Sequence, residues 1–138
     1  MKTLEKAVYN RIEPLLVLLR MRRFASVILF FVASCGKKDE IAPVISIASP
    51  VANQVFSAGE TVTIKATVTD NESLHMIHVI VIDNTGGHWV HSEEHVDGKT
   101  FDINKTFVAN AGKNYTISID GTDHDENTAT QEIRVSSN

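Results

Sequence analysis

Oxygen-bearing side chains recur at alternate positions near the end of the chain, in Asp123, Asp125 and Asn127. Carboxylate and amide oxygens are the ligands that Ca²⁺ prefers, and a calcium loop presents them at this spacing. The glycine and the distal glutamate of an EF-hand are missing, so this is a different kind of loop. Two interpretations remain open: a calcium site to which Asp70 and Glu72 also contribute, and turn formation, the common role of Asp and Asn in loops.

Six histidines, all beyond position 74, form a second group that could bind a metal. His91 and His95 are four residues apart, so on an extended strand they share a face. Imidazole suits Zn²⁺ or Cu²⁺, and Glu93 or Glu94 could add a ligand. His88 and His91 would point to opposite faces unless a bulge intervenes. The alternative is that these histidines simply face solvent.

Trp89 is the only tryptophan of the chain and lies beside a Gly-Gly pair. It could be an exposed platform for a sugar or protein partner, since aromatic side chains supply much of the energy of such contacts. Packing into an edge of the fold is the alternative. The sequence has no Gly-rich phosphate loop and no Ser or Cys nucleophile motif beside a histidine, so we expect no catalytic residue. An enzyme would require a deep pocket that gathers His75, His78 and acids.

Cys35 is the only cysteine, which excludes an intramolecular disulfide and a multi-cysteine zinc site. It divides residues 1–34, with a net charge of +4, from residues 35–138, with a net charge of −8. An acidic body without a basic stripe argues against a nucleic-acid partner. Residues 24–34 are apolar or small and follow Met21-Arg22-Arg23, as in a secretory signal, and they are too few to span a membrane.

The residues Val32-Ala33-Ser34-Cys35 resemble the bacterial lipobox, which implies that Cys35 carries a lipid and binds the chain to a membrane. Next come Lys38-Asp39-Glu40, similar to the export signal of Bacteroidota lipoproteins. This resemblance implies an outer-membrane location at the cell surface, with retention facing the periplasm as the alternative. Residues 1–20 fit a signal poorly, so either translation starts at Met21 or the charged region is extended.

From Pro43 onward, apolar and polar residues alternate in short runs separated by turn signals, without a helical period. Val62, Ile64, Ala66 and Val68 are expected to face inward. The run 74–82 is apolar at both parities, which indicates a central strand that is covered on both faces or lies beside an interface. About seven strands in this space predict an all-β sandwich. The expected strands are 44–47, 61–69, 74–82, 88–91, 101–107, 115–119 and 129–135.

Several segments carry a resemblance to bacterial Ig-like domains, of the fibronectin III or PKD type. These are 43–50, 56–60, 68–71 and 123–130. The resemblance covers nearly all of 43–135, and it is nearest to small Bacteroidota lipoproteins with one such domain of unknown function. Glu126 departs from the pattern, which usually has glycine before Asn127, so this turn is expected to differ. Tyr115 is placed like the tyrosine of a tyrosine corner.

An Ig-type strand order would bring the loops with Asp70 and Asp123 to one end of the sandwich, near Asp39 and Glu40. The turn at 84–87 would lie at the opposite end. We therefore expect a signal peptide in 1–34, a lipidated Cys35 and solvated tether in 35–42, and an antiparallel Ig-like β-sandwich in 43–138. The expected function is a non-catalytic binding module at the cell envelope. The alternatives are a histidine-rich metal-binding module and an accessory subunit of a glycan-uptake or adhesion assembly.

Overall fold

The computed structural model describes residues 37–138, and strands make up the regular secondary structure of this range. The strands are β1 (Val44–Ser49), β2 (Val55–Phe56), β3 (Thr61–Asp83), β4 (His88–Val108), β5 (Asn114–Asp123) and β6 (Thr128–Ser137). The described range contains no helix that is long and apolar enough to cross a membrane.

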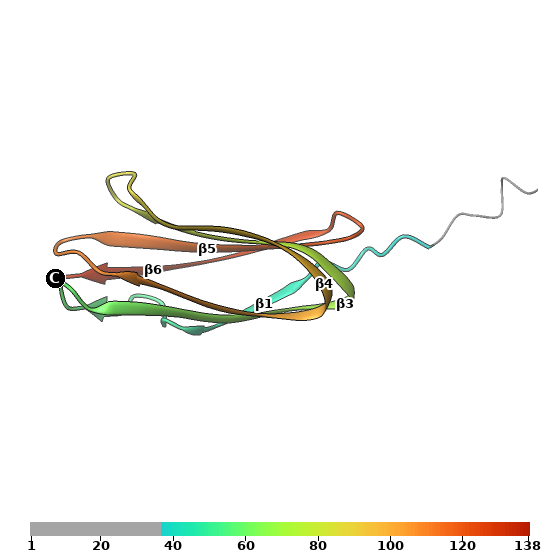
Figure 1. Ribbon diagram of the computed structural model, residues 1–138, viewed down its shortest axis with the longest axis horizontal. Helices are drawn as coiled ribbons and strands as arrows, with labels where there is room; N and C mark the ends of the chain where they lie inside the picture. The colour runs from blue at the N-terminus through green and yellow to red at the C-terminus, as the bar shows by residue number, and fades with distance from the viewer. Residues whose placement is uncertain (1–36) are drawn as a thin grey trace, which may run out of the picture. The chain divides into compact units, whose positions relative to one another are not determined.

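The two longest strands, β3 and β4, form an antiparallel ribbon that folds back on itself (Figure 1). Thr69 pairs with Thr100 and Leu74 with Gly98, so four residues of β3 lie opposite Lys99 alone. Such a mismatch bends a ribbon sharply, as β-bulges do. We call this bend, residues 70–73 of β3 with Lys99 of β4, the ribbon corner.

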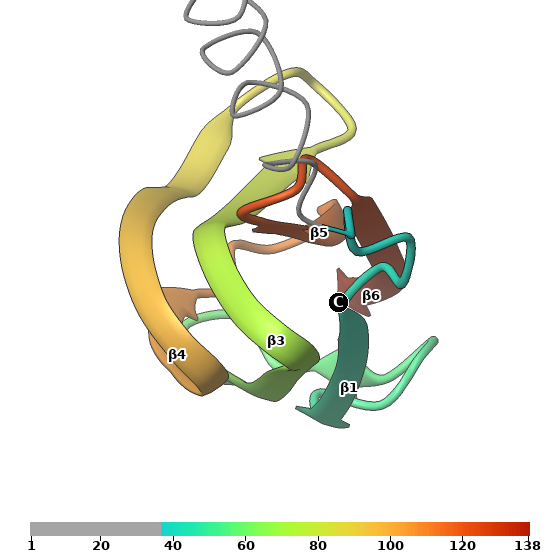
Figure 2. The same cartoon turned by 90° about the vertical axis from the view of Figure 1, so that its right-hand side faces the viewer.

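The folded ribbon creates the two layers of the sandwich. β1 pairs with the part of β3 before the corner, while β5 pairs with the part after it. β6 then pairs with β5, and the short β2 adds to β6 in parallel. Seen along the long axis in Figure 2, the strands surround the apolar core. The expected β-sandwich is confirmed.

The core follows the alternation expected from the sequence. Val62, Ile64, Ala66 and Val68 are all buried, as predicted. In β5 every second residue from Tyr115 faces inward, including Ile117 and Ile119. Because both layers of the folded sheet present an apolar face, their side chains meet in one cluster.

Six strands replace the expected seven. All seven predicted runs lie inside strands, but 61–69 and 74–82 are parts of β3, and 88–91 and 101–107 are parts of β4. The polar segments between them were expected to be loops. Residues 70–73 form the ribbon corner, whereas the segment 92–100 of β4 largely keeps pairing with β3. It can do so because β4 is an edge strand, and an edge strand tolerates charged residues. The two-residue β2 was missed.

The run 74–82 is the central strand that its composition indicated, with β4 on one side and β5 on the other. The prediction that it is covered on both faces is wrong. Ile77, Val79 and Val81 are buried, whereas Ile80 is half-buried and Ile82 is 38% exposed on the outer face.

The sandwich has two ends, which are called proximal and distal below. The proximal end contains the ribbon corner, the start of β1 and the β5–β6 turn; the distal end contains the β3–β4 turn and the start of β5. At the distal end the hydroxyl of the buried Tyr115 accepts a hydrogen bond from the backbone N–H of Asn110 at 2.7 Å. This contact confirms the predicted tyrosine corner.

Candidate functional site

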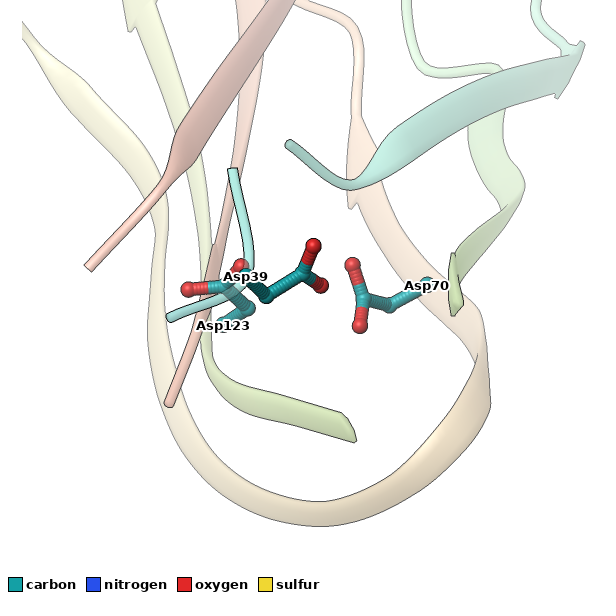
Figure 3. A group of neighbouring side chains, drawn as sticks. All are labelled: Asp39, Asp70 and Asp123. Atoms are coloured by element: carbon teal, nitrogen blue, oxygen red, sulfur yellow. The ribbon is translucent and has the colours of Figure 1, made fainter. Parts of the chain in front are cut away.

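Three aspartates meet at the proximal end and form the acidic cluster, Asp39, Asp70 and Asp123. Each offers a carboxylate oxygen, and these oxygens all lie within 4.8 Å of one another. Asp39 precedes β1, Asp70 lies in the ribbon corner and Asp123 ends β5. Figure 3 shows the side chain of Asp70 reaching toward that of Asp39.

Asp123 is the structural centre of the β5–β6 turn. Its Oδ1 accepts the backbone N–H groups of Asp125 and Asn127, both at 2.8 Å, and its Oδ2 accepts the Asn127 side-chain amide at 2.7 Å. Burial acts to raise the pKa of Asp123, but these hydrogen bonds outweigh it and the pKa lies below its ordinary value. Asp123 is therefore ionised in the folded protein at neutral pH.

Asp39 fastens the N-terminal part of the described chain to this turn. Its backbone N–H donates to Asp125 Oδ2 at 2.8 Å, and its carbonyl accepts Asn127 Nδ2 at 3.0 Å. Its own Oδ2 accepts Asn71 Nδ2 from the ribbon corner at 2.7 Å. The segment expected to be a solvated tether thus contacts the domain from Asp39 onward.

Asp70 is the member of the cluster with unused bonding capacity. Its Oδ1 accepts the backbone N–H of Glu72 at 2.8 Å. Its Oδ2 is buried and has no hydrogen-bond partner among the described residues. A buried carboxylate oxygen without a donor is costly, and a bound cation would offset that cost.

The expected calcium ligands are brought together only in part. Asp70 and Asp123 converge, and Glu72 and Asp125 line a small cavity of about 50 Å³ beside Asp39 and Asp123. Asn127 uses its amide nitrogen as a donor to the Asp39 carbonyl and to Asp123 Oδ2. Asp39, which sequence reasoning only placed nearby, belongs to the cluster itself.

The turns at the two ends have the same design. Asp83 Oδ1 accepts the N–H groups of Thr85 and Gly87, as Asp123 Oδ1 does those of Asp125 and Asn127. The residue three positions after each aspartate has a positive φ, 82° in Gly86 and 69° in Glu126. Glutamate at 126 therefore keeps the left-handed backbone that glycine adopts at the matching position of the distal turn. Glu126 adopts the left-handed conformation, which costs roughly 1–2 kcal/mol in a residue with a Cβ.

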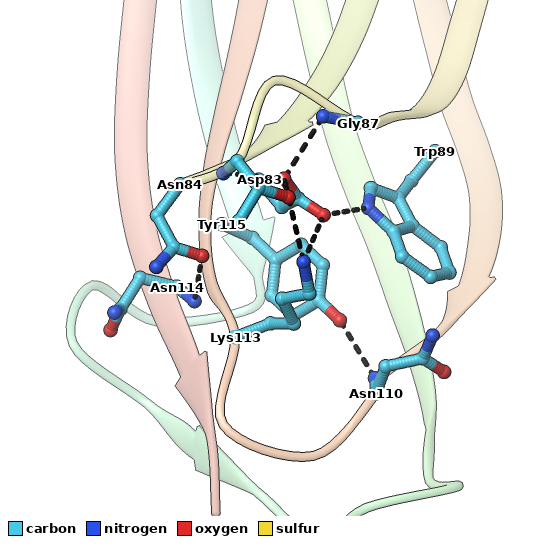
Figure 4. A network of polar contacts seen from close by, with 9 residues as sticks. Asp83, Asn84, Gly87, Trp89, Asn110, Lys113, Asn114 and Tyr115 are labelled. Atoms are coloured by element: carbon cyan, nitrogen blue, oxygen red, sulfur yellow. Dashed lines mark hydrogen bonds and ion pairs between the residues drawn. The ribbon is translucent and has the colours of Figure 1, made fainter.

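Asp83 is the most connected polar side chain of the distal end (Figure 4). It is 2% exposed and accepts hydrogen bonds from Thr85, Gly87 and Trp89 Nε1, and Lys113 Nζ lies 3.1 Å from its Oδ2. The hydrogen bond from the Thr85 hydroxyl, then that from the Gly87 N–H, holds the pKa of Asp83 well below its ordinary value of 3.8.

Trp89 is part of this network. Its indole is half-buried, packs against the core and meets the Tyr115 ring edge-on at a centroid distance of 5.7 Å. With its N–H donated to Asp83, the side chain packs at the sandwich edge, the alternative that the sequence left open.

His91 and His95 are both exposed on β4, and the regular pairing between them places them on one face. Four residue steps along the strand place them roughly 13 Å apart, too far for one ion with bonds of about 2 Å. The structure therefore does not bring this pair together. His91 lies instead beside His88, with ring centroids 6.5 Å apart, because Trp89 is an extra residue in the β3–β4 ladder.

The acidic neighbours of these histidines have other partners. Glu93 lies 3.3 Å from His78, and Glu94 accepts a hydrogen bond from Lys105 at 2.6 Å. The Lys105 bond lowers the pKa of Glu94 below its ordinary value. Neither glutamate is free to join a metal at His91.

A shallow cleft of about 450 Å³ opens at the distal end. The residues that line it include Asn53, Asn84, Asn114 and Arg134. Amide and guanidinium groups of this kind suit a polar ligand better than an apolar one.

Comparison with known proteins matches residues 43–135 to the bacterial Ig domain. No curated protein matches the chain in sequence. The fibronectin(III)-like modules of CbhA from Clostridium thermocellum are 22% identical, with a TM-score of 0.48, over 68% of this chain and 94% of that chain. A β-glucosidase from Listeria innocua, solved with glucose, is 12% identical with a TM-score of 0.39, over 68% of this chain and 16% of that chain.

The family match covers the sandwich from Pro43, the residue before β1, to Val135, a buried core residue of β6. It agrees with the strand alternation and with the tyrosine corner, which were derived from the residues themselves. The chain belongs to the bacterial Ig domain family.

Proposed function

We propose that this protein is a lipoprotein that presents one Ig-like, non-catalytic binding module at the outer membrane. The observation that carries the proposal is the position of Cys35. It ends an apolar stretch of signal-peptide length and lies four residues before Asp39, where contact with the domain begins. Cys35 itself lies outside the described residues. The sequence around it supports its lipidation.

The test of this proposal compares the full chain with a Cys35→Ser variant in a Gram-negative host. We expect the parent chain to incorporate an alkyne-tagged palmitate and to float with membranes, because several acyl chains anchor a protein firmly. The Cys35→Ser variant should lose both properties. A Ser34→Ala variant, which keeps the thiol and a small preceding residue, is the matched control. Membrane flotation of Cys35→Ser equal to that of the parent would contradict the proposal.

The surface location is tested in the same cells. If the module faces outward, protease added to intact cells degrades it, and degradation that requires cell lysis supports the periplasmic alternative. The distal cleft then lies at the end away from the anchor, where a protein or glycan partner would bind. Binding on a glycan array or in co-purification that is lost in Arg134→Ala would locate the partner there, and unchanged binding would exclude the cleft.

A second candidate function, calcium binding at the acidic cluster, is favoured by the unpartnered Oδ2 of Asp70. Three carboxylates so close repel one another unless a cation lies between them, and extracellular calcium modules bind in the range of about 10⁻⁴–10⁻³ M.

A thermal melt of the full chain tests the calcium site. We expect about 5 mM CaCl₂ to raise the melting temperature by several degrees, because a ligand at ten times its dissociation constant stabilises by about 1.4 kcal/mol. Asp70→Asn should abolish the shift and raise the melting temperature of the metal-free protein by relieving repulsion. The control is Asp102→Asn, at an exposed aspartate with one side-chain partner, which should leave the shift intact. The absence of a shift in the parent chain would reject the site.

A further inference from the structure

Three of the six histidines come together just past the ribbon corner, although none is near another in the sequence. His75 belongs to β3, His95 to β4, and His124 directly follows β5. The ring centroid of His75 lies 5.5 Å from that of His95 and 4.7 Å from that of His124. His75 therefore lies between the other two, and we call the three residues the histidine cluster.

Strand register explains why these rings meet. Leu74 pairs with Asp123 and Met76 with Thr122, so His75 is an extra residue of β3 relative to β5. In the other ladder His75 lies opposite two residues of β4, because Leu74 pairs with Gly98 and Met76 with His95. A bulge re-aims the side chain at its centre, and bulges are enriched next to functional sites.

The exposure of the side chains agrees with this register. Leu74 and Ile77 are buried, while His75 and Met76 between them are both half-buried. The bulge thus places His75 on the outer face, where neighbouring strands about 4.8 Å apart carry His95 and His124. Both of these are exposed, so an ion can reach the cluster from solvent.

Asp97 adds a feature that is typical of metal-binding histidines. His124 Nε2 lies 3.2 Å from Asp97 Oδ1. In the tautomer in which Nε2 donates to this carboxylate, Nδ1 keeps its lone pair for coordination. A carboxylate bonded in this way orients the ring of a ligand histidine and raises its basicity.

We propose that His75, His95 and His124 bind a divalent transition-metal ion of the Zn²⁺ class, with Asp97 as a positioning residue. The ring of His75 is inclined by 65° to that of His95 and by 49° to that of His124. Binding one ion would require the exposed His95 and His124 side chains to rotate so that their nitrogens face His75. This site goes beyond the proposed function. It also differs from the acidic cluster in chemistry, because imidazole nitrogens select Zn²⁺ or Cu²⁺, whereas carboxylates alone select Ca²⁺.

The test is a Zn²⁺ titration of the full chain, purified without a histidine tag, in competition with a chromophoric chelator. We expect one Zn²⁺ per chain, and a loss of affinity of more than 100-fold in His75→Ala and in His124→Ala. Asp97→Asn should weaken binding by about 10–100-fold, as removal of a carboxylate behind a ligand histidine does. Because His124 and Asp97 are exposed, their variants should melt at the parent temperature without metal.

The matched control is the double variant His88→Ala/His91→Ala, which removes the other close histidine pair. It should bind Zn²⁺ like the parent, and so should Asp70→Asn, which alters the acidic cluster. The proposal is overturned if the parent chain binds no Zn²⁺, if His75→Ala and His124→Ala bind like the parent, or if the double variant alone loses the metal. Lipidation of Cys35 has no part in this titration, so its failure leaves the lipoprotein proposal standing.

Discussion

Replacing Asp83 with alanine should lower the melting temperature of the protein by roughly 10 °C or more. The substitution removes the acceptor for two N–H groups and a hydroxyl in the turn, from Thr85 and Gly87, and for the indole N–H of Trp89. It also leaves Lys113 without its ion-pair partner. Donors that are left unpaired in a part-buried site cost the full free energy of their desolvation, so several small losses combine.

Thermal unfolding followed by circular dichroism measures this effect, with Asp102→Ala as the control. Asp102 is exposed and accepts one side-chain hydrogen bond, from Thr67, so its removal should shift the melting temperature by at most a few degrees. Equal shifts in the two variants would contradict the structural role of Asp83.

The pH dependence of stability gives a second readout for Asp83. Its pKa is depressed in the folded state, so its stabilising contribution is fully present above the ordinary value of 3.8 and is lost as the pH falls below it. The parent protein should therefore lose stability below about pH 4, and Asp83→Ala should lose less over the same range because it lacks this carboxylate. Parallel acid profiles would argue against the lowered pKa.

Truncation of Tyr115 to alanine should reduce the free energy of unfolding by about 3–5 kcal/mol, the usual cost of removing a buried aromatic ring. The ring is 1% exposed and packs against Phe107 at a centroid distance of 4.9 Å as well as against Trp89. Tyr115→Phe keeps the ring and removes only the acceptor of the Asn110 N–H, so it should cost about 1 kcal/mol.

Urea unfolding of the two Tyr115 variants separates packing from hydrogen bonding. The expected order is parent, Tyr115→Phe, then Tyr115→Ala, with the larger step between the last two. A phenylalanine variant as unstable as the alanine variant would show that the hydroxyl, rather than the ring, holds the corner together.

The fold could be predicted from the sequence because alternation alone decides which face of a strand is buried. Residues 61–69 show this clearly, since valine, isoleucine and alanine occupy every second position and threonine or lysine the others. The continuity of β4 through 92–100 could not be predicted. A segment with charged residues at both parities has the sequence pattern of a loop. It forms a strand here because it pairs with β3 along an exposed edge of the sheet.

The candidate sites also differ in how far they could be predicted from the sequence. The convergence of Asp70 with Asp123 followed from strand order, because loops at one end of a sandwich meet whatever their detailed register. The histidine cluster depends on a one-residue irregularity at His75 in two ladders at once. Spacing within β4 suggested a metal site at His91 and His95, which share a face but lie too far apart. Spacing within one strand does not reveal which residues of neighbouring strands lie beside each other.

The direction of β1 determines how the module would bear mechanical load under the proposed anchoring. β1 is the first strand after Asp39, and it runs from the proximal to the distal end while pairing with β3. A pull on the anchor along the strand would therefore act across the β1–β3 hydrogen bonds, which lie perpendicular to the strands. The load would strain these bonds together in shear instead of opening them one at a time. Shear is the stronger of these two arrangements, and it applies here because the domain is tethered by its N-terminal side.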